Sequence, residues 1–283
     1  MVGDVMLDVS VAASELERGG DVHGQLNVRP GGGGANAAVW AAHTGADVHF
    51  HGRIGDDAPG RVVADSLRER GVTAILTTDP AAPTGAILVV HHGGKRSMVA
   101  DRGANAHIAP QDLQDRLVAG AVQLSGYLLF HPGSEPAARA ALERAEAAHV
   151  AVDAASWPLI RDFGPERFVG ATRPATMLLA NQDEARTLAP GTPEESARVL
   201  SRRYRHAVVK LDEGGALLGE DDSVEHVGGR RVEPVDPTGA GDAFAGVLLA
   251  HLALGANLMD ALEEAVDAAA TVVGQAATWP EKG

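Results

Sequence analysis

The sequence predicts an α/β fold in which helices cover both faces of a mostly parallel sheet. From residue 109 onward, short apolar segments typical of strands alternate with longer helical ones. Ala, Val and Leu carry most of the 45% apolar content while aromatic residues make up only 4%, a composition suited to close helix-on-sheet packing. Several expected strands end in polar residues, at the sheet edge where such folds bind ligands.

The first third of the chain predicts a βαβα order with two added hairpins. A first strand is expected at 2–11, and the segments 9–13 and 22–28 form a hairpin outside the main core. A helix follows at 37–44 and ends at Gly45; a strand at 47–51, a loop at 52–60 and a helix at 61–70 come next. The segments 85–91 and 96–100 form a second hairpin that pairs with the first.

The remaining chain predicts repeated βα units. Helices are expected at 111–119, 136–148, 243–254 and 259–273, with a further helix after residue 184. Strands are expected at 127–130, 150–153, 177–180 and 207–211. No internal repeat or low-complexity linker divides the sequence.

Composition excludes several classes of function. The net charge of -14 opposes binding to nucleic acid or to an anionic membrane. Without cysteine the protein has no disulfide, no Cys-ligated zinc and no thiol nucleophile. Because no signal-like start and no 18-residue apolar run occur, we expect a soluble, cytoplasmic protein.

The segment 236–246, DPTGAGDAFAG, is the one around which the chemistry is organised. Thr238 can cap a helix that begins at or close to Gly239. The bare backbone amides there would hold an anion such as a transferring phosphoryl group, and Asp242, one turn in, can accept a proton from an attacking hydroxyl. The alternative is that Thr238 and Asp242 only cap a core helix.

Two further groups of residues have both a binding and a structural interpretation. The glycines at 31–34 are either a flexible linker or a close-approach site where a polyol binds the Asn36 amide, with Asp8 accepting hydroxyl hydrogens. Asp8 is otherwise a solvated acid. Asn181 and Glu184 are either a helix cap with a first-turn acid or a pair that holds water ligands of Mg²⁺ on nucleotide phosphates.

Taken together, GGGGAN at 31–36, NQDE at 181–184 and DPTGAGD at 236–242 resemble the ribokinase-like (PfkB) carbohydrate kinase family over nearly the whole chain. The resemblance implies a three-layer α/β/α domain with a small β lid. The core would comprise 1–8, 31–82 and 104–283, and the lid 9–30 and 83–103. It also implies transfer of the γ-phosphoryl group of ATP to a sugar hydroxyl.

The resemblance gives roles to individual residues. Asp242 looks like the base, and the amides of Gly239, Ala240 and Gly241 look like the anion hole. Asp8, Gly32, Gly33 and Asn36 resemble sugar contacts. Asn181 and Glu184 resemble the phosphate and Mg²⁺-water pair, while Lys210, Asp212 and Gly215 stand where the nucleotide loop begins. Asp236 and Thr238 resemble part of a monovalent-cation (K⁺) site.

Some positions depart from the family pattern. The family's first strand usually begins several residues earlier than this chain does, so we expect a truncated start and a weak first strand. The segment 273–278 matches the corresponding family segment poorly. The resemblance therefore does not establish the K⁺ site or the wall of the adenine pocket. Met6 and Gly33 replace polar side chains of some ribokinases. Arg102, at the return of the lid, either reaches an acidic sugar such as a keto-deoxy sugar acid or lies on the surface.

These observations indicate an ATP-dependent kinase of a small sugar such as ribose, a ketohexose or a keto-deoxy sugar acid. A nucleoside kinase of the same fold is the alternative, although residues 9–30 lack the Phe, Tyr or Trp that would face a base. A sugar-binding regulator without catalysis is disfavoured because Asp242 and the glycines are present. We expect a homodimer formed through the lid, because two short strand pairs cannot bury both faces within one chain.

Overall fold

A six-stranded sheet forms the middle layer of the protein. The computed structural model describes residues 1–12, 19–92, 95–275 and 277–281. The strands lie in the order β14-β13-β12-β11-β10-β8, in which β8 to β12 are parallel and β13 and β14 are antiparallel additions. Their bounds are Ser223–Gly228 for β14, Gly215–Glu220 for β13, His206–Lys210 for β12, Met177–Asn181 for β11, His149–Asp153 for β10 and Ala121–Ser125 for β8.

Residue Val2 joins this sheet to a two-stranded one. Strands β3 (Val48–Gly55) and β4 (Val72–Asp79) are parallel, and Val2 bridges both His51 of β3 and Leu124 of β8. The predicted first strand at 2–11 is therefore wrong as one element. Its start is one residue, Val2, that bridges two strands of the main layer, and its remainder, β1 (Met6–Ala12), belongs to another sheet.

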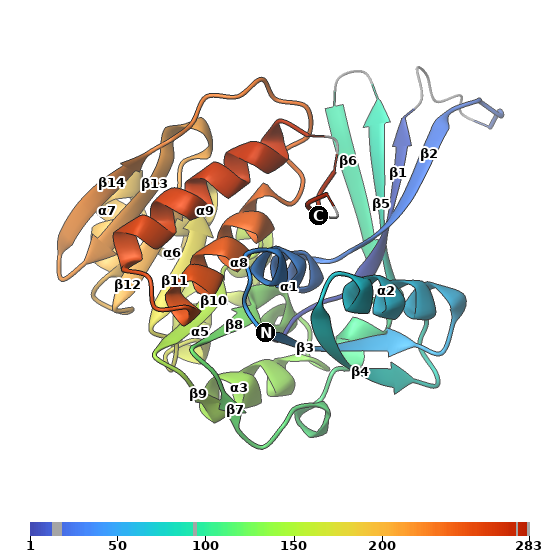
Figure 1. Ribbon diagram of the computed structural model, residues 1–283, viewed down its shortest axis with the longest axis horizontal. Helices are drawn as coiled ribbons and strands as arrows, with labels where there is room; N and C mark the ends of the chain where they lie inside the picture. Colours follow the sequence, from blue (N-terminus) through green and yellow to red (C-terminus); the bar gives the residue numbers. More distant parts are fainter. Residues whose placement is uncertain (13–18, 93–94, 276, 282–283) are drawn as a thin grey trace.

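Helices cover both faces of the six-stranded sheet, which confirms the predicted layered α/β architecture (Figure 1). One face packs against α8 and α9, and α1 lies alongside α8; the other packs against α3 to α7, while α2 covers β3 and β4. The helices are α1 Gly33–His43, α2 Ala58–Glu69, α3 Glu135–Arg144, α4 Trp157–Phe163, α5 Pro165–Ala171, α6 Gln182–Leu188, α7 Pro193–Leu200, α8 Ala240–Ala253 and α9 Leu258–Val273.

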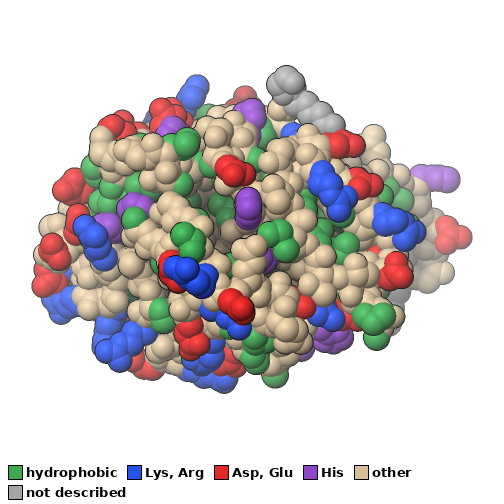
Figure 2. Space-filling view, turned by 60° about the horizontal axis from the view of Figure 1, so that its bottom comes forward, with side chains coloured by type: hydrophobic (Ala, Val, Ile, Leu, Met, Phe, Trp, Pro, Cys, Tyr) green, Lys and Arg blue, Asp and Glu red, His purple; other side chains and the backbone are tan. Residues whose placement is uncertain are grey.

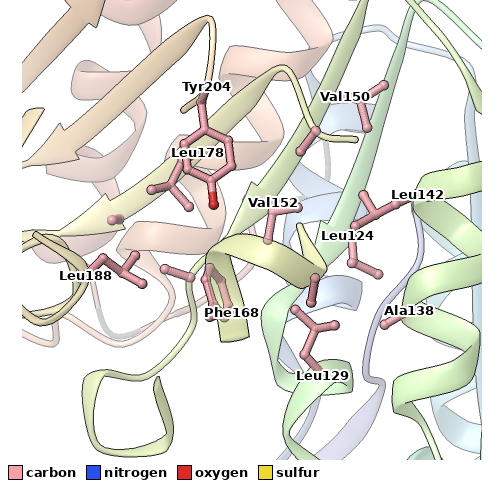
Figure 3. Packing of buried hydrophobic residues seen from close by; sticks show 14 of the residues in the cluster. Leu124, Leu129, Ala138, Leu142, Val150, Val152, Phe168, Leu178, Leu188 and Tyr204 are labelled. Carbon is pink, nitrogen blue, oxygen red and sulfur yellow. The ribbon is translucent and has the colours of Figure 1, made fainter. Parts of the chain in front are cut away.

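Strand β11 shows why this layering follows from the sequence. Successive side chains of a strand point to opposite faces, so a run of apolar residues requires cover on both. Met177 and Leu179 pack on the α8–α9 side, whereas Leu178 packs on the other side with Phe168 and Tyr204 (Figure 3). The buried hydroxyl of Tyr204 lies 2.6 Å from that of Thr172, so the core satisfies its polar atom as well.

A second sheet of four strands stands apart from the main layers, at the upper right of Figure 1. Its order is β2-β1-β5-β6, with β1 parallel to β5 and the other pairs antiparallel. Both predicted hairpin segments lie in it. The bounds of the three strands not yet given are Gln25–Gly31 for β2, Gly85–His92 for β5 and Lys95–Asp101 for β6.

The middle of the chain differs most from the expectation. The helix predicted at 111–119 is wrong, because the chain there makes a 3₁₀ turn at Pro110–Asp112 and the short strand β7 (Leu117–Val118). The strand predicted at 127–130 is a 3₁₀ helix, Gly126–Phe130, and the true strand β8 precedes it. Helix α3 ends at Arg144, before the short strand β9 (Ala145–Glu146), rather than at residue 148.

Other elements begin earlier than expected or were not anticipated. The predicted loop at 52–60 contains the end of β3 and the start of α2, where the Asp57 side chain accepts from the Gly60 amide and caps the helix. Strands β4, β13 and β14 and helices α4, α5 and α7 were not predicted. Among the described residues, no helix has the length and apolarity needed to span a membrane.

Candidate active site

Asp242 lies in the first turn of α8, which begins as the glycine motif predicts. Gly239 is the N-cap and adopts a left-handed conformation with φ of 84°, which a residue without a Cβ adopts at little cost. The predicted cap by Thr238 is thus wrong, since no side chain caps this end. The first amides of a helix have no partner within it, although the Ala240 amide donates to the carbonyl oxygen of Pro237 at 3.3 Å.

Asn36, on α1, holds the Asp242 carboxylate in place. Its Nδ2 donates to Asp242 Oδ2 at 2.8 Å, and its Oδ1 accepts from Trp279 Nε1 at 2.7 Å. The space beside the carboxylate is kept free by Gly33, where an added Cβ would lie 3.2 Å from Asp242 Oδ1. The Asn36 amide, predicted as a sugar contact, therefore has a direct contact with Asp242, the predicted base.

Asp4, which is buried, fixes the glycine turn that carries these residues. Its Oδ2 accepts from the Gly33 amide at 3.1 Å and its Oδ1 accepts from the Ser125 hydroxyl at 2.8 Å. Gly32 is the N-cap of α1 with φ of 93°, and an added Cβ would lie 2.7 Å from the Asp4 carbonyl oxygen. The glycines at 31–34 are thus a tight turn into a helix rather than a linker.

Lys210, at the end of β12, brings a positive charge to the start of α8. Its Nζ donates to Asp153 Oδ2 at 3.0 Å, and a Cβ on Gly241 would lie 3.3 Å from the same Nζ. Burial lowers the pKa of Lys210, but the Asp153 and Glu184 carboxylates outweigh it and hold the pKa above its ordinary value. The ammonium group is therefore charged at neutral pH beside the helix start.

Asn181 and Glu184 form a reciprocal cap at the start of α6. The Glu184 amide donates to Asn181 Oδ1 at 2.9 Å, and the Glu184 carboxylate accepts from the Asn181 amide and from its Nδ2, both at 2.8 Å. Only 4% of Glu184 is exposed, and burial raises its pKa to about 7 against the opposing effect of Lys210. The interpretation of Asn181 and Glu184 as a helix cap is therefore correct. It does not exclude that the same pair holds water ligands of Mg²⁺.

A cavity of about 510 Å³ opens beside the start of α8. It brings together most of the predicted nucleotide residues with Ala240 and Gly241, and apolar side chains of α8 and α9 form one wall. The lining includes Asn181, Lys210, Asp212, Gly215, Phe244, Val266 and Val273. A planar base fits the apolar wall, and phosphates fit the helix start.

Asp8 lies on β1 of the second sheet and not at the end of a core strand. Its side chain lies over Gly31, where a Cβ would come within 2.1 Å of Asp8 Oδ2. Asp8 Oδ1 is buried and has no hydrogen-bond partner among the described residues. Burial, together with the Asp4 charge, raises the pKa of Asp8 to about 7 despite Arg29.

The carboxylates of the site raise one another's pKa. Burial raises the pKa of Asp242 to about 7, the Asn36 hydrogen bond opposes that shift, and Asp153 and Asp4 add to it. Asp153 also raises the pKa of Glu184. A group whose pKa lies near 7 can take up a proton at neutral pH, as a general base must.

The same cluster fits a divalent cation bound with phosphates. Carboxylate oxygens are the ligands that Mg²⁺ prefers, and it usually takes only one or two from the protein while substrate phosphates supply others. Accordingly, among the residues that the structure describes, no group of three or more His, Asp or Glu side chains forms a metal site by itself. Asp236, one of the two residues expected at a K⁺ site, accepts the Thr238 amide at 2.9 Å on Oδ1.

Sequence reasoning missed several residues of this site. Asp153 ends the predicted strand 150–153, so its position at the ligand-binding edge was the available signal. Asp4 was seen only as an acid in the first strand. Tyr127 was placed in a strand, and nothing in the sequence signals that Trp279 reaches Asn36 from beyond α9.

A second cavity, of about 460 Å³, lies away from this site. Met1, His49, Gln123 and Leu249 are among its lining residues, between β3 and β8. It contains none of the predicted site residues. We therefore place the candidate active site at Asp242 and the cavity of about 510 Å³ beside the start of α8.

Comparison with known proteins identifies the family and the fold. The model of the family described as pfkB family carbohydrate kinase matches residues 1–280. Ribokinase of Mus musculus is 29% identical over 93% of this chain and 84% of its own length, and 2-dehydro-3-deoxygluconokinase of Thermoproteus tenax is 32% identical over 85% and 78%. The crystal structure of adenosine kinase from Sinorhizobium meliloti superposes with a TM-score of 0.89 at 24% identity, over 99% of this chain and 94% of that one.

Proposed function

Because the chain belongs to the pfkB family of carbohydrate kinases and is an ATP-dependent carbohydrate kinase, we propose that Asp242 is its general base. The acceptor is a small sugar held between Asp242 on α8 and Asp8 on the second sheet. The observation that carries this proposal is the Asp242 carboxylate, fixed by Asn36 at the start of α8 with a pKa near 7.

The mechanism follows from the positions of the groups. An acceptor hydroxyl that donates its hydrogen bond to Asp242 becomes nucleophilic as the proton moves to the carboxylate. Lys210 and the amides of Gly239, Ala240 and Gly241 lie where negative charge on the transferring phosphoryl group needs compensation. No covalent intermediate is required, since positioning and charge stabilisation lower most of the barrier.

ATP lies in the cavity of about 510 Å³ in this proposal. The apolar wall of α8 and α9 faces the base, while Asn181, Lys210, Asp212 and Gly215 lie toward the phosphates. The family uses ATP with a divalent metal such as Mg²⁺. Glu184, with Asp153 beside it, would hold the water ligands of the Mg²⁺, which when bound offsets the charge of the phosphates.

Asp236 and Thr238 are proposed as part of a monovalent-cation site. Their loop leads directly into Gly239, and the amides of Val235 and Asp236 donate to the Val273 carbonyl at 2.8 and 3.2 Å. A K⁺ ion there would tighten the loop that presents the anion hole. Turnover measured in KCl and in NaCl at equal ionic strength tests this assignment, and equal rates would contradict it.

The second sheet acts as a lid in this proposal, with Asp8 on the face that meets the sugar. Paired residues of neighbouring strands share a face, so Val9, Val28, Leu88 and Val99 form one row on the face opposite Asp8. Val28, Leu88 and Val99 are 56%, 39% and 66% exposed. A second copy that covers this row would give the homodimer, with strands of two lids packed face to face.

Nucleic acid and membrane are not expected partners. Basic and acidic side chains are mixed on the face shown in Figure 2, and the net charge is -14. We propose a cytoplasmic location because the reaction consumes ATP.

A nucleoside kinase is the second candidate. Trp279 places an indole ring beside Asn36, and such a ring is a surface on which a base stacks. The structural likeness to an adenosine kinase supports the same fold for both substrates. A regulator without catalysis is disfavoured by the presence of Asp242 with Asn36.

One experiment separates these functions. The protein is incubated with ATP, Mg²⁺ and a panel of ribose, fructose, 2-dehydro-3-deoxygluconate and adenosine, and ADP release is measured. A sugar-dependent rate supports the proposal, and a rate with adenosine alone supports the nucleoside kinase. Sugar binding by calorimetry without any turnover would support the regulator.

A further inference from the structure

Arg102 carries two guanidinium nitrogens without a partner. The residue follows β6 directly and is only half-buried, yet its Nε and Nη2 atoms are fully buried and have no hydrogen-bond partner among the described residues. Buried polar groups in proteins are nearly always hydrogen-bonded, and an unpaired buried charge is costly. The surface interpretation of Arg102 is therefore wrong for these two atoms.

The guanidinium group lies over the ring of Tyr127, 5.8 Å from its centroid. Burial raises the pKa of Tyr127, and Asp4 and Asp242 raise it further, which means that the ring lies within reach of the charges of the acceptor side. The guanidinium group of Arg102 is thus turned toward Tyr127 rather than away from the protein.

The backbone of Arg102 is held rigidly to the same part of the fold. Its carbonyl oxygen accepts from Asn105 Nδ2 at 3.1 Å, and Asn105, which is 1% exposed, also exchanges two hydrogen bonds of 2.9 Å with the Val5 backbone. Val5 adjoins Asp4, which fixes the glycine turn. Such a frame positions the guanidinium group before any ligand arrives.

We propose that Arg102 binds a carboxylate of the acceptor, so that the preferred substrate is a sugar acid. This inference rests on the proposed function, because it assumes that the acceptor lies between Asp8 and Asp242. Two guanidinium N–H groups match the two oxygens of a carboxylate. Asp8 lies on β1, and its Oδ1 atom has no hydrogen-bond partner among the described residues. It is therefore available to accept hydrogen bonds from hydroxyl groups of the same molecule.

A phosphate on the acceptor is a poorer match. Asp4 acts electrostatically on Asp8, and Asp4 and Asp242 both act on Tyr127, so a dianionic group near these carboxylates is repelled more strongly than a monoanionic one. The nearby cation Lys210 is already paired with Asp153 at 3.0 Å. One guanidinium group fits a single negative charge.

The test compares two acceptors that differ only in the charged group. With ATP and Mg²⁺, kcat/KM is measured for 2-dehydro-3-deoxygluconate and for 3-deoxyfructose, in which a hydroxymethyl group replaces the carboxylate; fructose 6-phosphate is the phosphate control. We expect the sugar acid to be preferred by roughly 10- to 150-fold, the usual value of a hydrogen-bonded charge. Equal rates for the pair, or preference for the phosphate, would overturn the proposal.

Variants then assign the preference to Arg102. Arg102→Met should raise KM for the sugar acid by roughly the same factor with little change in kcat, and should leave the neutral sugar unaffected. Arg102→Lys keeps the positive charge but loses the planar guanidinium that donates two parallel hydrogen bonds. Its KM for the sugar acid should therefore lie between those of the wild type and Arg102→Met. The matched control is Arg161→Met, which removes an exposed guanidinium that also lies over an aromatic ring, that of Trp157 at 5.6 Å.

The outcomes also distinguish this inference from the proposed function. If Arg102→Met leaves the KM for the sugar acid unchanged while sugars are still phosphorylated, the kinase assignment stays intact and the carboxylate site is refuted. If no acceptor is phosphorylated, calorimetry decides: binding of 2-dehydro-3-deoxygluconate that is lost in Arg102→Met but kept in Arg161→Met supports the site without the reaction. Absence of that binding refutes it.

Discussion

Asn36 donates a hydrogen bond of 2.8 Å to Asp242, a residue 206 positions further along the chain. The bond joins α1 to α8, the two helices that begin at the glycine motifs. Because it favours the charged form of the carboxylate, it opposes the pKa increase that burial causes. The pKa of Asp242, the proposed base, is therefore lowered by a residue that the sequence assigns to the sugar.

Replacing Asp242 by Asn tests the base. The substitution keeps the shape of the side chain and removes its basicity, so turnover should fall by about 10²- to 10⁴-fold. ATP affinity should stay the same or increase, since a negative charge near the phosphates is lost. If Asp242→Asn retains more than about a tenth of wild-type turnover at saturating substrates, Asp242 is only a first-turn acid of α8.

The same variant measures how pH acts on stability through Asp242. The carboxyl has a pKa of about 7 in the folded protein and an ordinary value of 3.8 when unfolded, so the folded state binds more protons between these values. The unfolding free energy of the wild type, relative to Asp242→Asn, should therefore fall as pH rises from about 4 to about 7 and then level off.

Urea unfolding of both proteins over this pH range gives that difference directly. Taking the difference cancels the other titrating groups, such as His51, whose pKa burial lowers to about 4. A difference that does not change with pH would mean that Asp242 is not buried in the way described.

Asp8→Ala tests the sugar contact. The variant should lose roughly 10- to 150-fold in sugar affinity while ATP affinity stays nearly the same, because Asp8 lies on the second sheet and ATP on the other side of the glycine turn. Calorimetry with each ligand gives both values, and Asp65→Ala, an exposed acid on α2, is the control. Unchanged sugar affinity in Asp8→Ala would remove the residue from the site.

The apolar row on the second sheet predicts dimerisation. Val99→Lys places a charge in this row and should convert a dimer into a monomer, because two like charges would meet across a two-fold axis. Val199→Lys, the same change at an exposed position of α7, should remain a dimer. Light scattering distinguishes them, and a wild type that is monomeric at micromolar concentration with full activity would exclude the interface.

The sequence predicts those elements that a local pattern of residues determines, and it fails where contacts between distant segments determine the structure. Helix α8 and its start at Gly239 follow from a local pattern, and so does the apolar strand β11. The predicted helix at 111–119 fails because Leu113 and Leu117 are buried by tertiary contacts in a non-helical segment, which local periodicity does not register. Tertiary context overrode propensity there.

The residues of the candidate site also divide into those that local sequence predicts and those that depend on distant segments. Asn181 and Lys210 end β11 and β12, so the rule that ligands bind at strand ends finds them, and Asp242 follows from the glycine motif at the start of α8. The contact of Trp279 with Asn36 and the unpaired nitrogens of Arg102 depend on how distant segments pack, and no spacing encodes them. The family pattern assigned Asn36 to the sugar but did not reveal its bond to the base.

The bridge at Val2 has a consequence for cooperativity. Backbone hydrogen bonds join β3 and β8 through the first residues. The Val2 amide donates to Gln123 of β8 and the Ser125 amide of β8 donates to Val2, while the Gly3 amide donates to His51 of β3 and the His51 amide donates to Met1. The unit of β3, α2 and β4 packs in an apolar cluster with α1 and Ala250 of α8, separate from the two clusters on the faces of the six-stranded sheet. It should open as a separate folding unit, so its amides should exchange with deuterium faster than those of β10 to β12, whereas uniform protection across both would mean that the whole sheet opens as one.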